Sequence, residues 1–233
     1  MTELIVVEAD ACAPSRAAAE WAAEDARLRG LPLRVVRIEG AEPAGAIAAA
    51  LGLRASITVL GLHGGDGVPV PAVSSVAHEV AAHSDLPVVL VPGGEWRTGQ
   101  VVLGVDARDP VSAVVDFAFD AARRRGARLH AIHTWRLPSC AKGWMPYALP
   151  EEDRGAWEDQ EVQLLSDALR PWREKYPRVN VYEDVRLQIP SAALVRASAS
   201  AELLVVGRAG RTLGPAVRAV LERTACPVAV VPG

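Results

Sequence analysis

Cysteine is scarce in this 233-residue chain, and its three copies, Cys12, Cys140 and Cys226, are widely spaced with no Cys-x-x-Cys pair. An odd, scattered set predicts neither a disulfide framework nor a zinc site and favours a reducing compartment. The chain also lacks a run of about 20 apolar residues, the length that spans a membrane. Its first residues lack the positive charge that opens a signal peptide. We therefore expect a cytoplasmic protein with no membrane partner.

The chain also lacks a large excess of charge of either sign, because 25 basic and 28 acidic residues leave a net charge of only −3. This balance argues against a surface that coats nucleic acid, so no nucleic-acid partner is expected. Half of the residues are hydrophobic, and a chain of this length can bury a large core. The composition predicts a soluble globular protein of one or two domains.

Common catalytic motifs are missing as well, since the sequence has no Walker GxxxxGK[ST], no GxSxG and no HExxH. His130 and His133 lie three apart on a predicted strand, so they point to opposite faces and cannot hold one metal ion together. We expect one of the two to be buried. These absences favour a non-enzymatic protein with no catalytic or metal site.

The sequence does contain an internal repeat. With Asp10 set against Asp106, IVVEAD-ACAPSRAAAEWAAEDARLRG aligns with VVLGVD-ARDPVSAVVDFAFDAARRRG, and Gly30 and Gly126 fall at the same offset. Each copy has an apolar strand that ends at the Asp, then a helical pattern that ends at the Gly. A second strand comes next in each copy. This alternation predicts a parallel sheet covered by helices.

The second copy predicts five strands and four helices. One helix is expected from about Pro150 to Lys175, and two shorter ones around Ala192–Ser200 and Ala216–Arg223. The long helix shows an apolar face made of Val162, Leu165, Leu169 and Trp172. The first copy is shorter by one helix and one strand, and in a sheet of order 3-2-1-4-5 the missing strand is the edge strand.

The two copies predict two modules, at residues 1–94 and 98–233, joined by the linker PGGEWRTGQ. Each module ends in a similar uncharged strand, LPVVLVPGG in the first and CPVAVVPG in the second. Two such edge strands are an aggregation hazard unless they are covered. We expect them to pair antiparallel with each other inside one chain, as a pseudo-twofold axis requires.

Several segments resemble the universal stress protein family in a tandem form: Val-Asp before an Ala-rich helix, GARLHAIHTW, ALRPWREKYP, PSAALVRASASAELLVVGRAGR and CPVAVV. The resemblance implies an α/β fold of two doubly wound, parallel-sheet modules (adenine nucleotide alpha hydrolase-like, 3-2-1-4-5), the first one truncated. It further implies a stress-response regulator with at most slow ATP hydrolysis. The implied ligand is ATP or another adenine nucleotide, with Mg²⁺ only alongside the nucleotide.

Family members of one type bind ATP through an Asp after the first strand and a loop Gly-x2-Gly-x9-Gly-(Ser/Thr) after the fourth. Carried onto the first copy, this pattern selects Asp10, Gly61, Gly64, Ser74 and Ser75, with Ser74 in place of a Gly. In the second copy the matching residues are Asp106, Gly207, Gly210 and Gly214. There the loop is six residues shorter and Pro215 replaces the hydroxyl. We therefore expect at most one weak site, in the first copy, dependent on Asp10 and Ser75.

Other interpretations of these residues remain open. Asp10 and Asp106 can simply end a strand or cap a helix, although Asp109 is the nearer cap for a helix that begins near Pro110. Arg208 and Arg211 form either an anion clamp or a solvated surface.

The rival function is a degenerate module pair that binds no nucleotide and acts as a protein-interaction scaffold. Its contact patch would be Trp144, Met145, Tyr147 and Trp157, which can equally form a lid over the module's own core. The sequence leaves open a homodimer and an unidentified protein partner.

Overall fold

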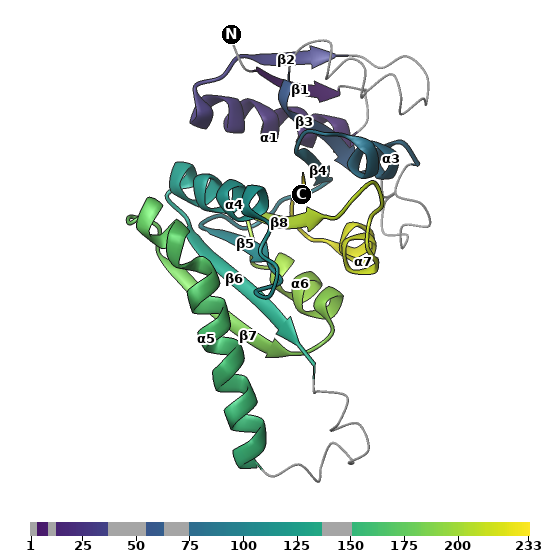
Figure 1. Cartoon of the computed structure of the whole chain (residues 1–233). Coiled ribbons are helices and arrows are strands. Elements are labelled where there is room, and N and C mark those ends of the chain that lie inside the picture. Colours follow the sequence, from purple (N-terminus) through teal and green to yellow (C-terminus); the bar gives the residue numbers. More distant parts are fainter. Residues whose placement is uncertain (1–3, 9–12, 37–54, 63–74, 137–150) are drawn as a thin grey trace.

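The computed structural model describes residues 4–8, 13–36, 55–62, 75–136 and 151–233. Within these ranges nine strands form one sheet in the order β2-β1-β3-β4-β9-β8-β5-β6-β7 (Figure 1). The strands are β1 Leu4–Glu8, β2 Leu33–Val36, β3 Ala55–Leu62, β4 Val88–Pro92, β5 Gln100–Gly104, β6 Arg128–Trp135, β7 Val181–Leu187, β8 Leu203–Arg208 and β9 Val228–Pro232. The helices are α1 Ala13–Arg29, α3 Ser75–His83, α4 Ser112–Arg125, α5 Glu151–Lys175, α6 Pro190–Ser198 and α7 Pro215–Arg223.

The second half of the chain has the predicted doubly wound topology. Its strands β5 to β9 alternate with α4 to α7, all neighbouring strands run parallel, and their order is the expected 3-2-1-4-5. The described strands of the first half have the same order as far as they go, with β1 between β2 and β3 and β4 outside β3. The α/β fold class predicted from the sequence is confirmed.

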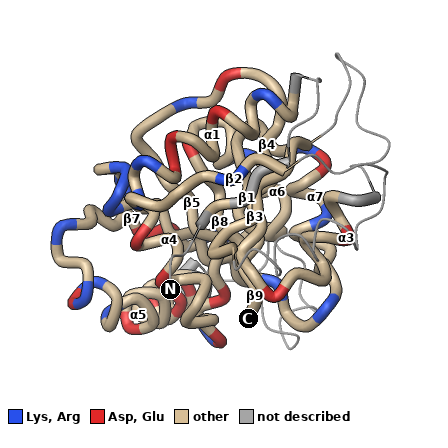
Figure 2. Tube along the Cα trace, turned by 90° about the horizontal axis from the view of Figure 1, so that it is seen from above, with Lys and Arg blue, Asp and Glu red and all other residues tan. Residues whose placement is uncertain are grey.

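The two halves meet at the last strand of each. β4 runs antiparallel to β9, with Val88 opposite Val230, Val89 opposite Ala229 and Leu90 opposite Val228. This ladder is short, but it makes one continuous sheet of the two halves, whose other neighbours are all parallel. Strands β3, β4, β5 and β9 carry no charged residue, and charges gather on the helices and loops around them (Figure 2).

Two hydrophobic cores lie on the two faces of the sheet, and each draws on both halves. Helices α1, α4 and α5 cover one face, while α3, α6 and α7 cover the other (Figure 1). In the first core Trp21 of α1 and Phe119 of α4 pack with Val89 and Ala229 of the central ladder. In the second, Val80 of α3 and Val220 of α7 pack with Val88 and Val230. The same ladder therefore supplies residues to both cores.

Two expectations about helix residues are corrected. Val162 of α5 is exposed, whereas Leu165 and Leu169 are fully buried, because Glu161 occupies the buried position one turn before Leu165. Asp109 does not cap α4, since the N-cap residue is Val111 and no side chain bonds the free N–H groups there. The predicted helix ends at Gly30 and Gly126 are confirmed, because both glycines adopt positive φ angles of 66° and 60°.

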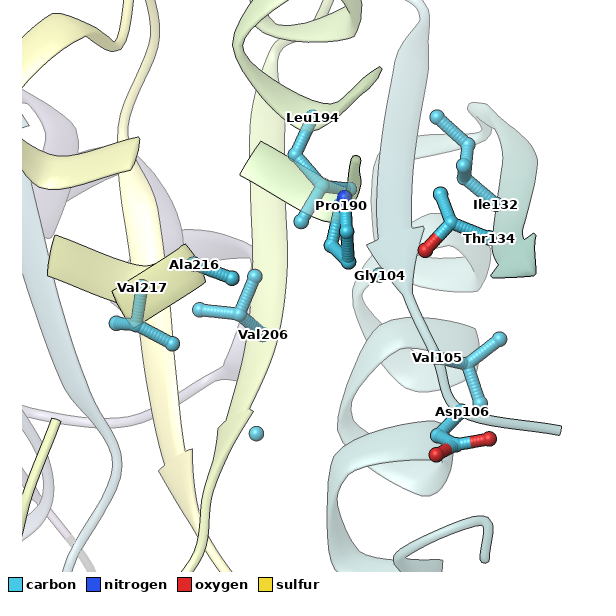
Figure 3. Close-up of a pocket in the computed structure, with 11 residues that line it drawn as sticks. Gly104, Val105, Asp106, Ile132, Thr134, Pro190, Leu194, Val206, Ala216 and Val217 are labelled. Carbon is cyan, nitrogen blue, oxygen red and sulfur yellow. The ribbon is translucent and has the colours of Figure 1, made fainter. Parts of the chain in front are cut away.

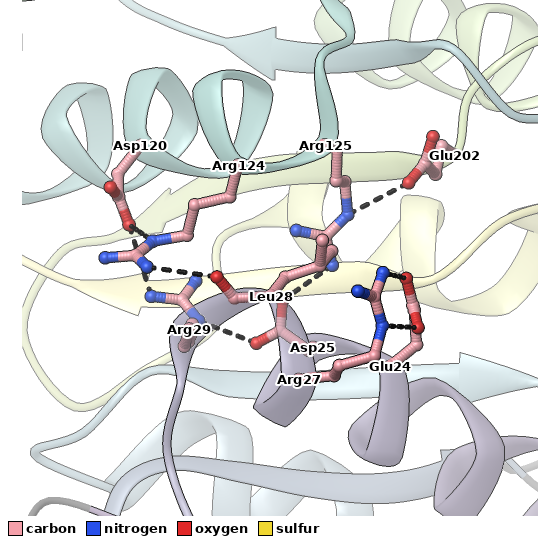
Figure 4. A network of polar contacts seen from close by, with 9 residues as sticks. All are labelled: Glu24, Asp25, Arg27, Leu28, Arg29, Asp120, Arg124, Arg125 and Glu202. Carbon is pink, nitrogen blue, oxygen red and sulfur yellow. Dashed lines mark hydrogen bonds and ion pairs between the residues drawn. The ribbon is translucent and has the colours of Figure 1, made fainter.

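A buried network of ion pairs joins α1 to α4 (Figure 4). Asp25 is completely buried and accepts hydrogen bonds from Arg29 and Arg125, both at 2.7 Å. Arg125 also pairs with Glu202 at 3.0 Å, and Asp120 of α4 pairs with Arg29 at 3.3 Å. Charged groups thus bridge the two halves on the face where α1 and α4 lie together.

Candidate functional site

A crevice opens where β5 and β8 end side by side. Two cavities, of about 210 and 270 Å³, lie there and share the lining residues Gly104, Val105, Asp106 and Gly207. In a doubly wound sheet, the helices after these two strands leave toward opposite faces, which opens a crevice at the carboxyl ends of the strands. The structure therefore brings together Asp106 and Gly207, two of the residues selected from the sequence.

The smaller cavity is mainly apolar (Figure 3). Ile132, Leu194, Val206 and Val217 line it, with the Thr134 hydroxyl and the exposed Asp106 as polar side chains. An apolar slot with a few polar groups suits a flat organic ring, and a carboxylate beside it can accept hydrogen bonds from hydroxyl groups.

The crevice glycines allow the helices to approach the sheet closely. A Cβ at Gly207 would lie 3.1 Å from Cγ2 of Val114 in α4, and one at Gly104 would lie 3.0 Å from both δ-methyl groups of Leu194 in α6. Either neighbour would have to move to admit a side chain. Gly207 thus has a packing role in addition to any contact with a ligand.

The turn that carries Asp106 rests on a buried polar pair that sequence reasoning did not find. His133 lies behind the turn, with its Nδ1 3.3 Å from both the Ala107 N–H and the Val105 carbonyl. Its Nε2 lies 3.1 Å from Glu161 of α5, and Arg108 contacts both residues. Asp106 itself accepts the Arg108 N–H at 3.0 Å, which closes the turn. The pair positions the backbone on both sides of Asp106.

This pair also corrects the expectation that one of His130 and His133 is buried, because both are. They do face opposite sides of the sheet: His130 bonds Asp184 on β7, and His133 bonds Glu161 on α5. Residue spacing could have placed Glu161 on the buried face of α5, one turn before Leu165. It could not have shown that a histidine 28 positions earlier makes that burial tolerable.

Arg208 and Arg211 do not form the anion clamp that one interpretation of the sequence offered. Arg208 is buried and donates to the carbonyls of Ser84 (2.6 Å) and Gly210. Arg211 donates to the His83 carbonyl at 3.1 Å and pairs with Asp85 at 3.7 Å. Both guanidinium groups therefore hold the C-terminal end of α3, where free carbonyls attract cations. Burial lowers the pKa of Arg208, with Arg211 adding to this and Asp85 opposing it.

The other two loop residues selected in the second half, Gly210 and Gly214, line neither crevice cavity. Gly210 adopts a φ of 63°, and Gly214 is the N-cap residue of α7 with Pro215 in the first turn. Proline has no N–H to offer a phosphate, but its fixed φ suits the start of a helix. Ala216 and Val217, which come next, do line the crevice.

Of the first-half candidates, Asp10, Gly64 and Ser74 lie outside the described residues, as do Trp144, Met145 and Tyr147 of the expected contact patch. Ser75 begins α3. Gly61 lies in β3, where a Cβ would come within 2.8 Å of the Pro14 carbonyl carbon and 2.9 Å of the Ser15 nitrogen. Its lack of a side chain is required by the close approach of α1. Trp157 of α5 is half-buried.

This sheet order and the crevice at its switch point define an α/β protein of the adenine nucleotide alpha hydrolase-like fold. The sequence model of the universal stress protein family matches residues 98–232, which is more than half of the chain. The chain therefore belongs to the universal stress protein family.

Curated relatives extend the match beyond the second half. A universal stress protein of Mycobacterium tuberculosis (strain H37Rv) is 28% identical over 303 aligned positions, which cover 97% of this chain and 94% of the relative. One from Mycolicibacterium smegmatis is 30% identical over 190 positions, covering 76% and 62% of the two chains. The first alignment is longer than this chain of 233 residues, so that relative carries segments that this chain lacks.

Solved structures agree on the fold. A universal stress protein from Archaeoglobus fulgidus superposes with a TM-score of 0.64 at 14% identity, covering 98% of this chain and 96% of its own. A functionally unknown protein from Pseudomonas aeruginosa gives 0.61 at 15% identity, covering 99% and 82%. No helix in the described part of the chain is long and apolar enough to cross a membrane.

Proposed function

We propose that the chain is a regulatory stress-response protein that binds an adenine nucleotide weakly in the crevice between Asp106 and Gly207. The observation that carries the proposal is the convergence of these two residues, far apart in the sequence, on the lining of the same two cavities. The smaller, mainly apolar cavity would take the adenine ring. Asp106 would accept hydrogen bonds from the ribose hydroxyl groups.

The same geometry argues that binding is weak. After the loop that follows β8, helix α7 begins with Pro215, which has no N–H to offer a phosphate. Arg208, a buried cation that lines the larger cavity, already bonds the carbonyls of Ser84 and Gly210. Adenosine or a monophosphate should consequently bind about as tightly as ATP with Mg²⁺, because the phosphates gain few partners. No step of catalysis is proposed.

Calorimetric titration of the full chain with adenosine, with AMP and with ATP plus Mg²⁺ tests this proposal. Asp106→Ala should abolish binding, while Asp10→Ala, the same change at the equivalent residue of the first half, should leave it intact. Loss of binding in Asp10→Ala alone would move the site to the first half, where the sequence predicts it with Asp10, Gly61, Gly64, Ser74 and Ser75. Wild-type protein that binds none of the three would contradict nucleotide binding altogether.

A second candidate function, a scaffold for protein interaction without nucleotide, is favoured by the use of Arg208 and Arg211. Both arginines stand in or near the shortened loop, and both donate hydrogen bonds to carbonyls at the end of α3 in the first half. A loop engaged in that way serves the junction of the halves. Nucleotide titration separates the two functions, because the scaffold binds none. Arg211→Ala removes one of these contacts at a residue that lines neither crevice cavity, so it should leave nucleotide binding unchanged if the crevice is the site. The protein partner, a homodimer, the cytoplasmic location and the module boundaries 1–94 and 98–233 stay predictions.

A further inference from the structure

A third cavity lies at the other end of the second half. It measures about 280 Å³ and is lined by Gln100 of β5, Arg128 and His130 of β6, Tyr182 and Arg186 of β7, and Arg196, Ala197 and Ser200 at the end of α6 and after it. Gln100 and Arg128 are the first residues of their strands, whereas the Asp106 crevice lies beyond the last residue of β5. No residue lines both places.

Positive charge dominates this cavity. Three arginines line it, and the neighbouring carboxylate, Asp184, is already bonded by Arg186 at 2.9 and 2.5 Å and by His130 at 2.7 Å. Arg128 and Arg196 are exposed, and within the described ranges neither makes an ion pair. Two guanidinium groups therefore face the cavity without a counter-charge.

Neutral groups complete the wall with further donors and flat surfaces. Gln100 Nε2 lies 3.4 Å from His130 Nδ1 and 3.5 Å from Ser200 Oγ, so the amide and hydroxyl sit together at the cavity. The imidazole of His130 lies 4.9 Å from the ring of Tyr182, which is half exposed. The pKa of His130 is lowered, first by burial and further by the charges of Arg186 and Arg128, against the opposing effect of Asp184. Asp184 thus outweighs either arginine at this imidazole, and the uncompensated positive charge of the cavity belongs to Arg128 and Arg196.

We propose that this cavity is a phosphate-binding site, separate from the crevice, that takes free phosphate or the phosphate group of a small ester. Arg128 and Arg196 would pair with the phosphate oxygens, since the planar guanidinium matches phosphate with two parallel hydrogen bonds. Gln100 would donate to a remaining oxygen, whereas the Ser200 hydroxyl already donates to the Ala197 carbonyl at 3.2 Å. An organic group attached to the phosphate would lie against Tyr182. This inference is independent of the proposed nucleotide site.

Nuclear magnetic resonance of the ¹⁵N-labelled full chain tests the site, with inorganic phosphate and phenyl phosphate titrated separately at constant ionic strength. Amides of residues 128–130, 182–186 and 196–200 should shift and saturate together. The double variant Arg128→Gln/Arg196→Gln should raise the dissociation constant about tenfold or more, as expected for the loss of charge-assisted hydrogen bonds. Tighter binding of phenyl phosphate identifies the ester as the ligand, and weaker binding identifies free phosphate.

Arg223→Gln is the matched control, because Arg223 is also an exposed arginine in the last turn of a nine-residue helix. It should leave both titrations unchanged. Equal weakening by this control would mean diffuse attraction of anions by surface charge, and would overturn the proposal. Shifts confined to residues 206–217, or shifts that never saturate, would overturn it too.

Discussion

Arg29 and Arg125 occupy the same place in the two copies of the repeat, and each contacts an aromatic ring of the other half. Arg29 directly precedes Gly30, and Arg125 directly precedes Gly126, the glycine at the same place in the repeat. Trp21 and Phe117 stand nine residues before Gly30 and Gly126, respectively. Arg29 lies 5.2 Å over the ring of Phe117, and Arg125 lies 5.2 Å over the ring of Trp21. The two contacts are therefore reciprocal across a pseudo-twofold axis, as an isologous interface requires.

Asp25 breaks this symmetry, and its removal should be costly. It is buried and bonds both arginines at 2.7 Å, so Asp25→Ala leaves the buried Arg125 guanidinium with Glu202 as its remaining carboxylate. Loss of one partner from a buried ion pair costs about 3–5 kcal/mol of unfolding free energy. Urea denaturation should show this loss. Glu24→Ala, which breaks the exposed pair with Arg27 in the same helix, should change the midpoint little; equal midpoints for the two variants would contradict the role of Asp25.

His130 should make stability depend on pH. Burial lowers its pKa more strongly than the bond to Asp184 raises it, so the folded chain binds a proton there less readily than the unfolded chain. The unfolded imidazole takes up its proton near the usual value of about 6.5. As the pH falls below that value, the free energy of unfolding should fall until the lower pKa of folded His130 is reached. His130→Gln should lessen this slope, and a His130 resonance that titrates above pH 6.5 would rule the explanation out.

Asp184 contributes in a different pH window. Burial by itself would raise the pKa of this carboxyl group, but hydrogen bonds from Arg186 and His130 outweigh it and lower the pKa. Its stabilising effect is therefore present above the usual carboxyl pKa of about 3.9 and is lost as the pH falls below it. The two groups of one hydrogen bond thus act at separable pH values.

Among the elements, α3 depends on contacts from the other half of the chain. It is nine residues long, and Arg208 and Arg211 bond the carbonyls at and just beyond its end. Arg208→Ala removes a buried charged donor, a loss of about 1–3 kcal/mol. Hydrogen exchange should become faster at residues 80–86. Arg211→Ala, at the exposed neighbour, should change exchange less; the reverse order of effects would contradict the leading role of Arg208.

The elements themselves were largely predictable from the sequence, because strand and helix periodicity in the second half is regular. The four helices and five strands described there occur where the patterns place them. Val162 was misplaced because an apolar residue was preferred to a charged one, and Glu161 faces inward only because His133 is there to bond it. Likewise, no local signal shows that the Arg208 guanidinium bonds the carbonyls of Ser84 and Gly210. Partners distant in the sequence decide where polar side chains point.

For the whole molecule, the shared sheet makes the two halves one structure. Both cores contain residues of the β4–β9 ladder, so separation of the halves would expose apolar surface on both faces at once. The crevice and the phosphate cavity both lie in the second half, at opposite ends of its strands. The first half contributes through the junction, by way of Asp25 on one face and the end of α3 on the other.

A single buried charge should therefore lower the free energy of unfolding most when it is placed in the β4–β9 ladder. Val89 is completely buried opposite Ala229, and Val89→Lys would place an unpaired ammonium group in the core. We expect a loss of about 3 kcal/mol or more, together with association between chains through the exposed strand edges. Val35→Lys makes the same change at an exposed valine of β2 and should alter stability by less than about 0.5 kcal/mol. Native-state hydrogen exchange gives the independent check: amides of 88–90 and 228–230 should be among the most protected, and rapid exchange of both segments would mean that the halves are not joined by this ladder in solution.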